Sequence, residues 1–335
     1  MNEKIKTVRL GFLIFPGFPM SCLTSAIEPV RAANEIAETE AFSWVLISEN
    51  GSRVNSSARV GFDPDMALFD VEELDYLFLL SEPKSVFDNP AKSNGRLRRL
   101  ARSGTRLGGV SGGVFPLARS GLLDGYQCSV HWCYEAAFAA EFPTLSAASD
   151  VMVIDRNRYT VSGAAAAFDL MLNLIEQSLS EDVATEVACW FQHPLMRGQG
   201  VRQKIPTFKS KSTSDMLPAA IARAVEMFAN HIEDPVQVTD VASAVGLSPR
   251  QLERSFKAAT GQSPLNYYRF LRMKAARQLV MYSRDTMTEI AGAVGYSSSS
   301  QLAKHYRAAF NISPQEERRK INLFRVERNR SIPSA

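Results

Sequence analysis

The strongest constraint on the fold is a short internal repeat in the last third of the chain. Residues 241–246 read Val-Ala-Ser-Ala-Val-Gly and residues 290–295 read Ile-Ala-Gly-Ala-Val-Gly, and each run precedes a second helical pattern that begins near a serine. Small apolar residues at helical spacing followed by Gly predict a short helix and a tight turn, because Gly enters left-handed conformations at little cost. The sequence therefore predicts two helix-turn-helix units.

The predicted helices of these units carry typical start signals. Thr239 is placed to cap the first helix, since its hydroxyl can accept a hydrogen bond from an otherwise unpaired amide. Ser248-Pro249 begins the second helix, and the serines at 297–300 begin its equivalent. Between the units, residues 264–281 are expected to form one amphipathic helix. Its expected inward-facing residues are Leu265, Tyr268, Leu271, Ala275 and Leu279.

Charge is divided unevenly along the 335 residues. Residues 1–208 carry 19 Lys and Arg against 24 Asp and Glu, a net charge of −5, whereas residues 209–335 carry 19 against 11, a net charge of +8. A basic C-terminal part on an acidic N-terminal part indicates a polyanionic partner, such as DNA, for the C-terminal part alone.

The N-terminal part alternates short apolar runs with helical patterns. Strands are predicted at 8–15, 44–48, 76–80 and 106–110, and helices at 24–36, 91–102, 114–120 and 166–178. This alternation predicts an α/β domain with a flavodoxin-like parallel sheet between two layers of helices, followed by an all-α domain.

The length allows two domains, each with a core of its own. We expect an α/β ligand-sensing and dimerisation domain at 1–205 and a double helix-turn-helix domain at 218–320. Residues 206–217, rich in Ser and Lys without apolar periodicity, are expected to form the linker, and 321–335 a basic tail.

Residues 218–320 resemble the DNA-binding domain of the AraC/XylS family of transcription regulators. The matching motifs are Arg272-Met-Lys-Ala-Ala-Arg277-Gln-Leu, Val294-Gly-Tyr296 and Ser313-Pro314. The chain departs from the family at 298–302, where an aromatic residue is common. The resemblance implies a sequence-specific regulator of promoter DNA that is usually an activator. It also implies a homodimer that works with RNA polymerase.

In this family the second helix of each unit enters the major groove, so its exposed polar residues are the candidates for reading bases. These candidates are Arg250, Gln251, Arg254, Ser299, Gln301, Lys304 and His305. Phosphate contacts are expected from Arg272, Lys274, Arg307, Arg318 and Arg319. A solvated helix face is the alternative for any single residue, but the set as a whole favours a DNA-binding surface.

The N-terminal part contains a possible nucleophile elbow. Gly109-Val-Ser111-Gly-Gly113 follows a predicted strand and precedes a predicted helix, which is the setting of the GxSxG motif of serine hydrolases. A hydrolase or amidase tethered to DNA, with Ser111 as nucleophile and His131 as base, is therefore the alternative function. Asp124 or Glu135 would then orient the histidine.

Residues 8–200 resemble the DJ-1/PfpI-like, class I glutamine amidotransferase-like domain. The resemblance rests on Leu13-Ile-Phe-Pro-Gly-Phe18, the elbow, Val130-His131-Trp132 and Thr160-Val-Ser-Gly163. Enzymes of that superfamily carry Cys at the elbow and often a Glu after the first strand, whereas this chain has Ser111 and Met20-Ser-Cys22. The resemblance therefore implies a catalytically inactive sensor domain rather than an enzyme.

With Gly121-Leu-Leu-Asp-Gly-Tyr126 and His131-Trp132, the chain resembles regulators that join such a domain to an AraC-type domain, and this resemblance implies a small-metabolite ligand such as a quaternary amine or an amino acid. Backbone amides after Ser111 are expected to favour an anionic group, and the Trp132 ring attracts a quaternary ammonium. As an isolated residue, Trp132 is more often a core residue. The predicted ligand-binding residues are Pro16, Phe18, Ser111, Gly112, His131 and Trp132.

Three classes of protein are disfavoured by the sequence. No apolar stretch approaches the roughly 20 residues of a membrane helix, and the polar start lacks a secretory cleavage site, so we expect a cytoplasmic protein. Cys22, Cys128, Cys133 and Cys189 lack the spacing of a zinc site. We therefore expect reduced thiols, no metal and no cofactor.

Overall fold

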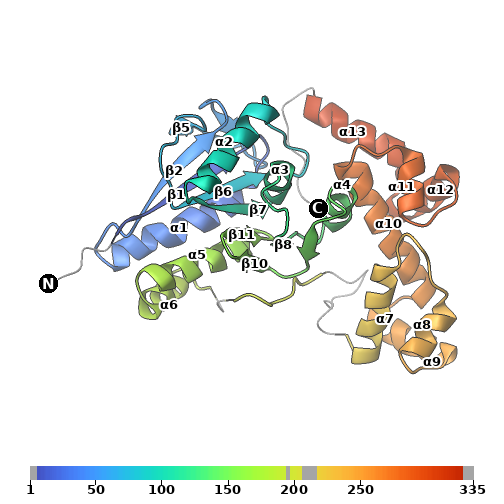
Figure 1. Cartoon of the computed structure of the whole chain (residues 1–335). Coiled ribbons are helices and arrows are strands. Elements are labelled where there is room, and N and C mark those ends of the chain that lie inside the picture. The colour runs from blue at the N-terminus through green and yellow to red at the C-terminus, as the bar shows by residue number, and fades with distance from the viewer. Residues whose placement is uncertain (1–5, 194–196, 206–216, 327–335) are drawn as a thin grey trace. The chain divides into compact units, whose positions relative to one another are not determined.

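The computed structural model describes residues 6–193, 197–205 and 217–326, with side chains described as far as residue 320. The chain divides into two compact units, one ending at Gln203 and one formed by Lys204–Leu323 (Figure 1). Each unit is described by itself. Except for Leu217, the expected linker 206–217 lies outside the described residues, as does most of the expected tail 321–335.

A seven-stranded sheet forms the centre of the first unit. The strand order is β10-β11-β7-β6-β1-β2-β5, and every neighbouring pair is parallel except β10 and β11. The bounds are β1 Val8–Ile14, β2 Phe42–Ser48, β5 Met66–Ala67, β6 Tyr76–Ser81, β7 Arg106–Ser111, β10 Met152–Asp155 and β11 Arg158–Val161. Two small sheets pair β3 Val54–Asn55 with β4 Gly61–Phe62, and β8 Gln127–Ser129 with β9 Ser146–Ala148.

Helices cover both faces of the sheet. From β1 the chain crosses to β2 in one direction, and from β6 it crosses to β7 in the other, so right-handed connections place α1 and α2 on opposite faces. Helices α1, α5 and α6 pack together on one face, with α2 on the other (Figure 1). The bounds are α1 Met20–Ile36, α2 Pro90–Arg102, α3 Val114–Arg119, α4 Glu135–Glu141, α5 Ala164–Ser178 and α6 Glu181–Trp190.

These elements confirm the predicted α/β fold. The four predicted strands and four predicted helices are all present, and the largest error in a boundary is at α1, which begins at Met20 rather than Thr24. The sequence interpretation did not assign β3 to β5 or β8 to β11, which are two to four residues long. Runs this short carry too little periodicity to be recognised.

In its described residues the second unit consists of helices. They are α7 Ala219–Asn230, α8 Val238–Ala244, α9 Pro249–Thr260, α10 Pro264–Tyr282, α11 Met287–Ala293, α12 Ser299–Phe310 and α13 Pro314–Val326. Two hydrophobic cores lie along α10. The first contains Phe228, Phe256 and Tyr268, and the second contains Met273 and Tyr306. The long helix therefore joins two small cores, one for each helix-turn-helix unit.

Two details of the predicted helical domain are wrong. Helix α8 is preceded by Gln237 and contains Thr239 in its first turn, so Thr239 does not cap it. Leu265, in the first turn of α10, is 54% exposed rather than inward-facing, whereas Tyr267 two residues later is buried in the first core. Tyr268 and Leu279 are buried as predicted.

Candidate functional site: two helix-turn-helix units and a remodelled elbow

The first helix-turn-helix unit consists of α8, a glycine turn and α9. Gly246 has a φ of +75°, the left-handed conformation that the tight turn requires. Ser248 then caps α9 with a reciprocal capping box, since its hydroxyl accepts from the Gln251 amide while the Gln251 side chain accepts from the Ser248 amide. Val241 and Leu252 are fully buried between the helices. The turn, cap and core together fix the orientation of α9.

The second helix-turn-helix unit repeats this construction with α11 and α12. Gly295 has a φ of +71°, and Ser298 caps α12 by accepting from the Gln301 amide. Leu302 is fully buried in the same way as Leu252. Tyr296, which precedes the missing aromatic position at 298–302, is buried in this core.

The predicted base-reading residues lie on α9 and α12, but they differ in accessibility. Arg250, Gln251 and Arg254 are exposed on α9, and Gln301 and Lys304 are exposed on α12. The structure thus gathers most of the candidates on the solvent-facing sides of the two second helices.

Two of the other candidates are more constrained. Ser299 is the first residue of α12, is partly buried, and occupies the position that Pro249 holds in α9. His305 is partly buried with its Nδ1 2.9 Å from the Tyr296 hydroxyl, and desolvation lowers the pKa of His305. These contacts make both residues weaker candidates for a base contact.

Some of the predicted phosphate contacts are committed to the protein itself. The Arg272 guanidinium donates to the carbonyl oxygens of Val294 and Gly295 and lies over the Tyr296 ring. Arg318 donates to three backbone carbonyls, including that of Val280 at 3.1 Å. Both arginines therefore bond backbone carbonyls at or just after the ends of α11 and α10, which makes them weaker candidates for phosphate contacts.

The remaining phosphate candidates differ in burial. Lys274 is half-buried, and its desolvation lowers the pKa of its ammonium group. Arg307 and Arg319 are exposed. Of the five predicted phosphate contacts, these two keep the accessibility that the role needs.

A buried polar network fastens α12 to its neighbours. Glu317 of α13 accepts from Arg277 of α10 at 2.9 and 2.5 Å and from the hydroxyl of Tyr306 on α12 at 2.6 Å. Tyr306 is fully buried and Glu317 is 8% exposed. Since one carboxylate contacts three helices, it holds the second recognition helix in place.

In the α/β unit, the predicted elbow has the geometry of a strand-to-helix turn. Ser111 ends β7, is buried, and has a φ of +54°, which is unusual for a residue with a side chain. A Cβ on Gly112 or Gly113 would collide with the backbone of β6. The elbow is therefore as tight as in enzymes with a GxSxG motif.

The groups around Ser111 do not form a catalytic triad. His131 Nδ1 lies 2.8 Å from the Cys133 sulfur, and burial raises the pKa of that thiol to about 12, so the thiol keeps its proton and donates to Nδ1. The proton of the neutral imidazole is then on Nε2, which leaves no free lone pair. Among the described residues, no hydrogen bond joins His131 to Ser111, Asp124 or Glu135.

The predicted anion cradle after Ser111 is smaller than expected. Helix α3 has six residues. The amide of Gly113 donates to the Val110 carbonyl at 2.9 Å, and the amide of Phe115 donates to the Gly112 carbonyl at 3.0 Å. These two donors are used within the turn, so the amides give an anion less support than the motif suggests.

His131 and Trp132 lie near the same edge of the sheet as Ser111. Strand β11 pairs with β7 up to Val161, and a Cβ on the following Gly163 would lie 3.6 Å from the His131 ring. The His131 and Trp132 rings are 5.5 Å apart. Burial lowers the pKa of His131, so the pair presents a neutral imidazole beside a half-buried indole.

A residue that the sequence interpretation missed holds this pair in place. The Gln203 carboxamide accepts from the Trp132 amide at 2.9 Å and donates to the Val130 carbonyl at 2.7 Å. Gln203 is 7% exposed and is the last residue of the first unit before the division of the chain. No local motif marks it, because its partners lie about 70 residues away.

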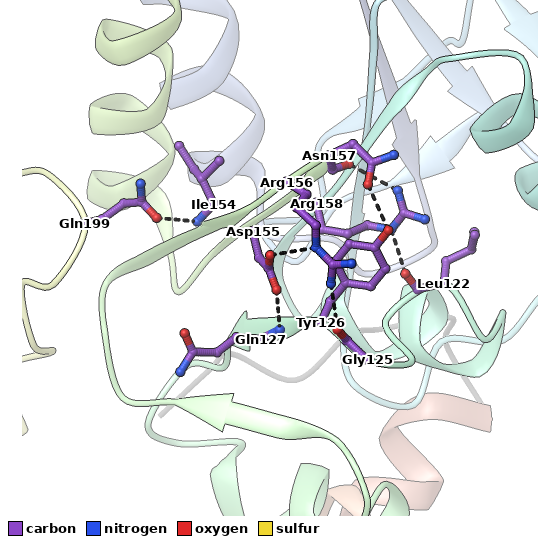
Figure 2. A network of polar contacts seen from close by, with 10 residues as sticks. All are labelled: Leu122, Gly125, Tyr126, Gln127, Ile154, Asp155, Arg156, Asn157, Arg158 and Gln199. Atoms are coloured by element: carbon purple, nitrogen blue, oxygen red, sulfur yellow. Dashed lines mark hydrogen bonds and ion pairs between the residues drawn. The ribbon is translucent and has the colours of Figure 1, made fainter.

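The strand that leads to His131 is fixed by the polar network in Figure 2. The Gln127 amide at the start of β8 donates to Asp155, which also accepts from Arg156. The Arg156 and Arg158 guanidinium groups lie 3.8 and 4.7 Å from the Tyr126 ring centre. Burial lowers the pKa of Arg158. These contacts join the loop before β8 to the β10–β11 hairpin and so position the residues that follow β8.

The other predicted ligand residues are divided between surface and core. Pro16 is exposed after β1, whose carboxyl end lies beside that of β6 at the elbow. Phe18 is fully buried, with its ring 5.3 Å from Phe62 in the hydrophobic core. Phe18 therefore packs in the core, which makes it a weaker candidate for a ligand contact.

The parts of the chain that the structure describes contain neither a membrane-spanning helix nor a metal-binding cluster. No helix there is long and apolar enough to cross a membrane. No group of three or more His, Cys, Asp or Glu side chains in those residues could hold a metal ion.

Similarity to known proteins covers almost the whole chain. Residues 241–320 match a family model described as a helix-turn-helix domain. The HTH-type transcriptional regulator GbdR of Pseudomonas aeruginosa is 33% identical over 309 residues, covering 92% of this chain and 83% of the relative. GlxA of Rhizobium meliloti, with the same description, is 32% identical over 93% of this chain and 96% of the relative. The crystal structure of an AraC family transcriptional regulator from Pseudomonas putida has a TM-score of 0.50 at 25% identity, covering 55% of this chain and 99% of that chain.

Proposed function

The chain belongs to the AraC/XylS family of helix-turn-helix transcription regulators, and from this premise we propose that it inserts α9 and α12 into successive major grooves of promoter DNA under the control of a small metabolite. The observation that carries the DNA-binding part is the paired construction of the two units, each with a buried leucine and a serine-capped second helix. The exposed cations Arg254 and Lys304 give both helices charge complementary to DNA.

Footprinting of the full-length protein on a duplex selected from a random pool tests this proposal. Two protected major grooves about one helical turn apart are expected for each domain. Arg254→Ala should weaken binding, whereas Arg223→Ala, at an exposed position on α7, should leave it close to that of the wild type. Protection of a single groove, or equal losses in the two variants, would contradict the proposal.

We propose that the effector is a quaternary amine or an amino acid bound beside His131 and Trp132. Two observations support this site. The indole of Trp132 is half-buried next to a neutral imidazole, which suits a cationic group better than a charged histidine would. The hydroxyl of Ser81, which pairs with Ser111 across the parallel strands, is buried without a hydrogen-bond partner in the described residues. This edge therefore holds a polar group that a ligand or water can satisfy.

Gln203 offers a direct route from this site to the DNA-binding unit. Its side chain is bonded to the backbone on both sides of His131, and its own backbone continues to residue 204, where the second unit begins. A ligand that binds the DNA-competent arrangement with a different affinity shifts the population of that arrangement. Movement of Trp132 would thus be transmitted by the Gln203 side chain to the backbone at residues 203 and 204.

Thermal unfolding with a panel of glycine betaine, carnitine and free amino acids tests the effector site, because a ligand that binds the folded state raises the melting temperature. The shift should be lost in Trp132→Ala and kept in Trp190→Ala, a tryptophan of α6 that is 51% exposed. A shift that survives Trp132→Ala would place the ligand elsewhere in the protein.

The alternative function is a serine hydrolase or amidase, and the strained φ of Ser111 is the observation that favours it. The hydrogen bond between the Cys133 thiol and His131 argues against a hydrolase, because the imidazole nitrogen that would act as general base already accepts a proton donor. Consumption of a bound metabolite by the wild type but not by Ser111→Ala would establish the enzyme. Recovery of all the ligand unchanged supports the sensor.

The remaining parts of the proposal follow from family membership. We propose a cytoplasmic homodimer that activates transcription through contact with RNA polymerase. Light scattering of the full-length protein measures the oligomeric state, and transcription from a selected promoter with purified polymerase measures the direction of regulation. A monomer, or a lower transcript yield on addition of the protein, would contradict these two points respectively.

A further inference from the structure

The two recognition helices can be compared position by position, because α9 and α12 align without a gap. Four landmarks define the register: the N-caps Ser248 and Ser298, the buried Leu252 and Leu302, the buried Phe256 and Tyr306, and the left-handed C-caps Gly261 and Asn311. Every pair is separated by the same interval in the sequence. Corresponding side chains therefore leave the two helices at equivalent positions relative to the caps and cores.

Several exposed positions have the same chemistry in both helices. A cation occurs at Arg254 and Lys304, and the side chain of the first glutamine of each helix is bonded to a serine that precedes the helix. Gln251 Oε1 accepts from Ser248, and Gln301 Oε1 is bonded to the hydroxyl of Ser297. These positions do not distinguish one unit from the other, and both carbonyl groups are already in use.

Two further positions of the register differ in chemistry, and of their four residues Ala303 is partly buried while the others are exposed. Arg250 of α9 corresponds to Ser300 of α12, and Glu253 corresponds to Ala303. Glu253 was not among the residues predicted to contact DNA. It lies within one turn of Arg250 and Lys257 on an exposed helix surface, yet in the described part of the chain it forms no ion pair. The first helix thus carries a free carboxylate among cations, and the second has a methyl group there.

A carboxylate facing DNA is unfavourable unless it finds a donor. Phosphates repel it, so it lowers affinity for every sequence that offers no hydrogen bond at its position. In the major groove the N4 amino group of cytosine is the donor that glutamate recognises, whereas guanine and thymine offer no donor there and the amino group of adenine lies beside the N7 acceptor, which repels a carboxylate. Glu253 therefore has the chemistry of a residue that rejects most sequences and accepts a cytosine.

We propose that Glu253 is a specificity-determining residue that selects a cytosine in the part of the operator bound by the first helix-turn-helix unit, and that the second unit lacks this selection because Ala303 replaces the carboxylate. The proposal rests on the proposed DNA-binding function. The two halves of each operator site are accordingly unequal. One half contains a required C·G pair at the Glu253 position, and the other tolerates any base pair at the equivalent position.

Selection of binding sites from a random duplex pool tests the proposal with the full-length protein and its variants. The wild type should enrich one invariant cytosine, and replacement of that base pair should weaken binding roughly 5- to 150-fold. Glu253→Ala should lose the preference at that position alone and bind mixed-sequence duplex more tightly than the wild type. Ala303→Glu should create a second cytosine preference about one helical turn away.

Two controls separate this effect from changes in charge or folding. Glu186→Ala removes an exposed carboxylate from α6 in the other unit and should leave both the selected sequence and the affinity unchanged. Far-ultraviolet circular dichroism checks that Glu253→Ala and Ala303→Glu keep the wild-type helix content. An unchanged selected sequence in Glu253→Ala would overturn the proposal and identify the residue as part of a solvated face. Failure of the wild type to enrich any sequence would instead overturn the proposed function.

Discussion

Glu317→Ala is the substitution expected to weaken the second helix-turn-helix unit most selectively. The carboxylate joins α10, α12 and α13 through Arg277 and Tyr306. Tyr306 is fully buried, so its hydroxyl would lose its acceptor without access to water, at a cost of about 1–3 kcal/mol. The Arg277 side chain is 37% exposed, so water replaces part of its lost ion pair and this contribution is about 1 kcal/mol. The free energy of unfolding of this unit should therefore fall by about 2–4 kcal/mol.

The distribution of tryptophan makes this loss measurable in the full chain. All three tryptophans, at 44, 132 and 190, lie in the first unit. Tryptophan fluorescence therefore follows the unfolding of the first unit, whereas far-ultraviolet circular dichroism follows both units. Glu317→Ala should lower the urea midpoint of the helical unit by about 1–2 M in the dichroism signal and leave the fluorescence transition in place.

The neighbouring Glu316 provides the control. Its side chain is 47% exposed and accepts from Ser313 at the start of α13, so Glu316→Ala should shift the dichroism midpoint much less than Glu317→Ala. Equal midpoints for Glu317→Ala and the wild type would refute the argument that the buried carboxylate stabilises the unit. A shift confined to the fluorescence signal would refute the assignment of that carboxylate to the second unit.

Three further predictions concern the first unit. Gly113→Ala should lower the fluorescence urea midpoint, because the added Cβ meets the Leu79 carbonyl, whereas Gly95→Ala in α2, with open space around it, should raise it slightly. A thiol reagent near neutral pH should label exposed Cys189 quickly and leave the three buried thiols unlabelled, since burial raises their pKa values to about 12; rapid labelling of more than one would contradict their burial. Burial depresses the pKa of His131, so the stabilising contribution of its neutral form should be present above about pH 6.5 and lost as the pH falls. The wild type should therefore lose more stability than His131→Gln between about pH 7.5 and 5.5. Equal losses would disprove the burial argument for His131.

The sequence predicts the helical unit well because its signals are local. The serine before Pro249 and the glycine at 246 each determine one helix end within a few residues, and both occur where predicted. The roles of the arginines depend on distant partners. Arg272 and Arg307 look alike in the sequence, but Arg272 faces the end of α11 and gives its donors to carbonyl groups there, while Arg307 remains exposed. The charge of a residue can be read from the sequence alone, whereas the groups that bond it are distant in the sequence and are known only from the fold.

The elbow shows a different limit of inference from a motif. The pattern around Ser111 predicts a tight strand-to-helix turn, and that turn is present. Its glycines are required by packing: a Cβ on Gly109 would lie 2.8 Å from the Val114 amide nitrogen, and one on Gly112 would collide with the Ser81 carbonyl. These contacts do not involve the serine hydroxyl. The same glycines are therefore needed whether or not a nucleophile stands between them, so the motif by itself does not distinguish a hydrolase from a ligand-binding domain.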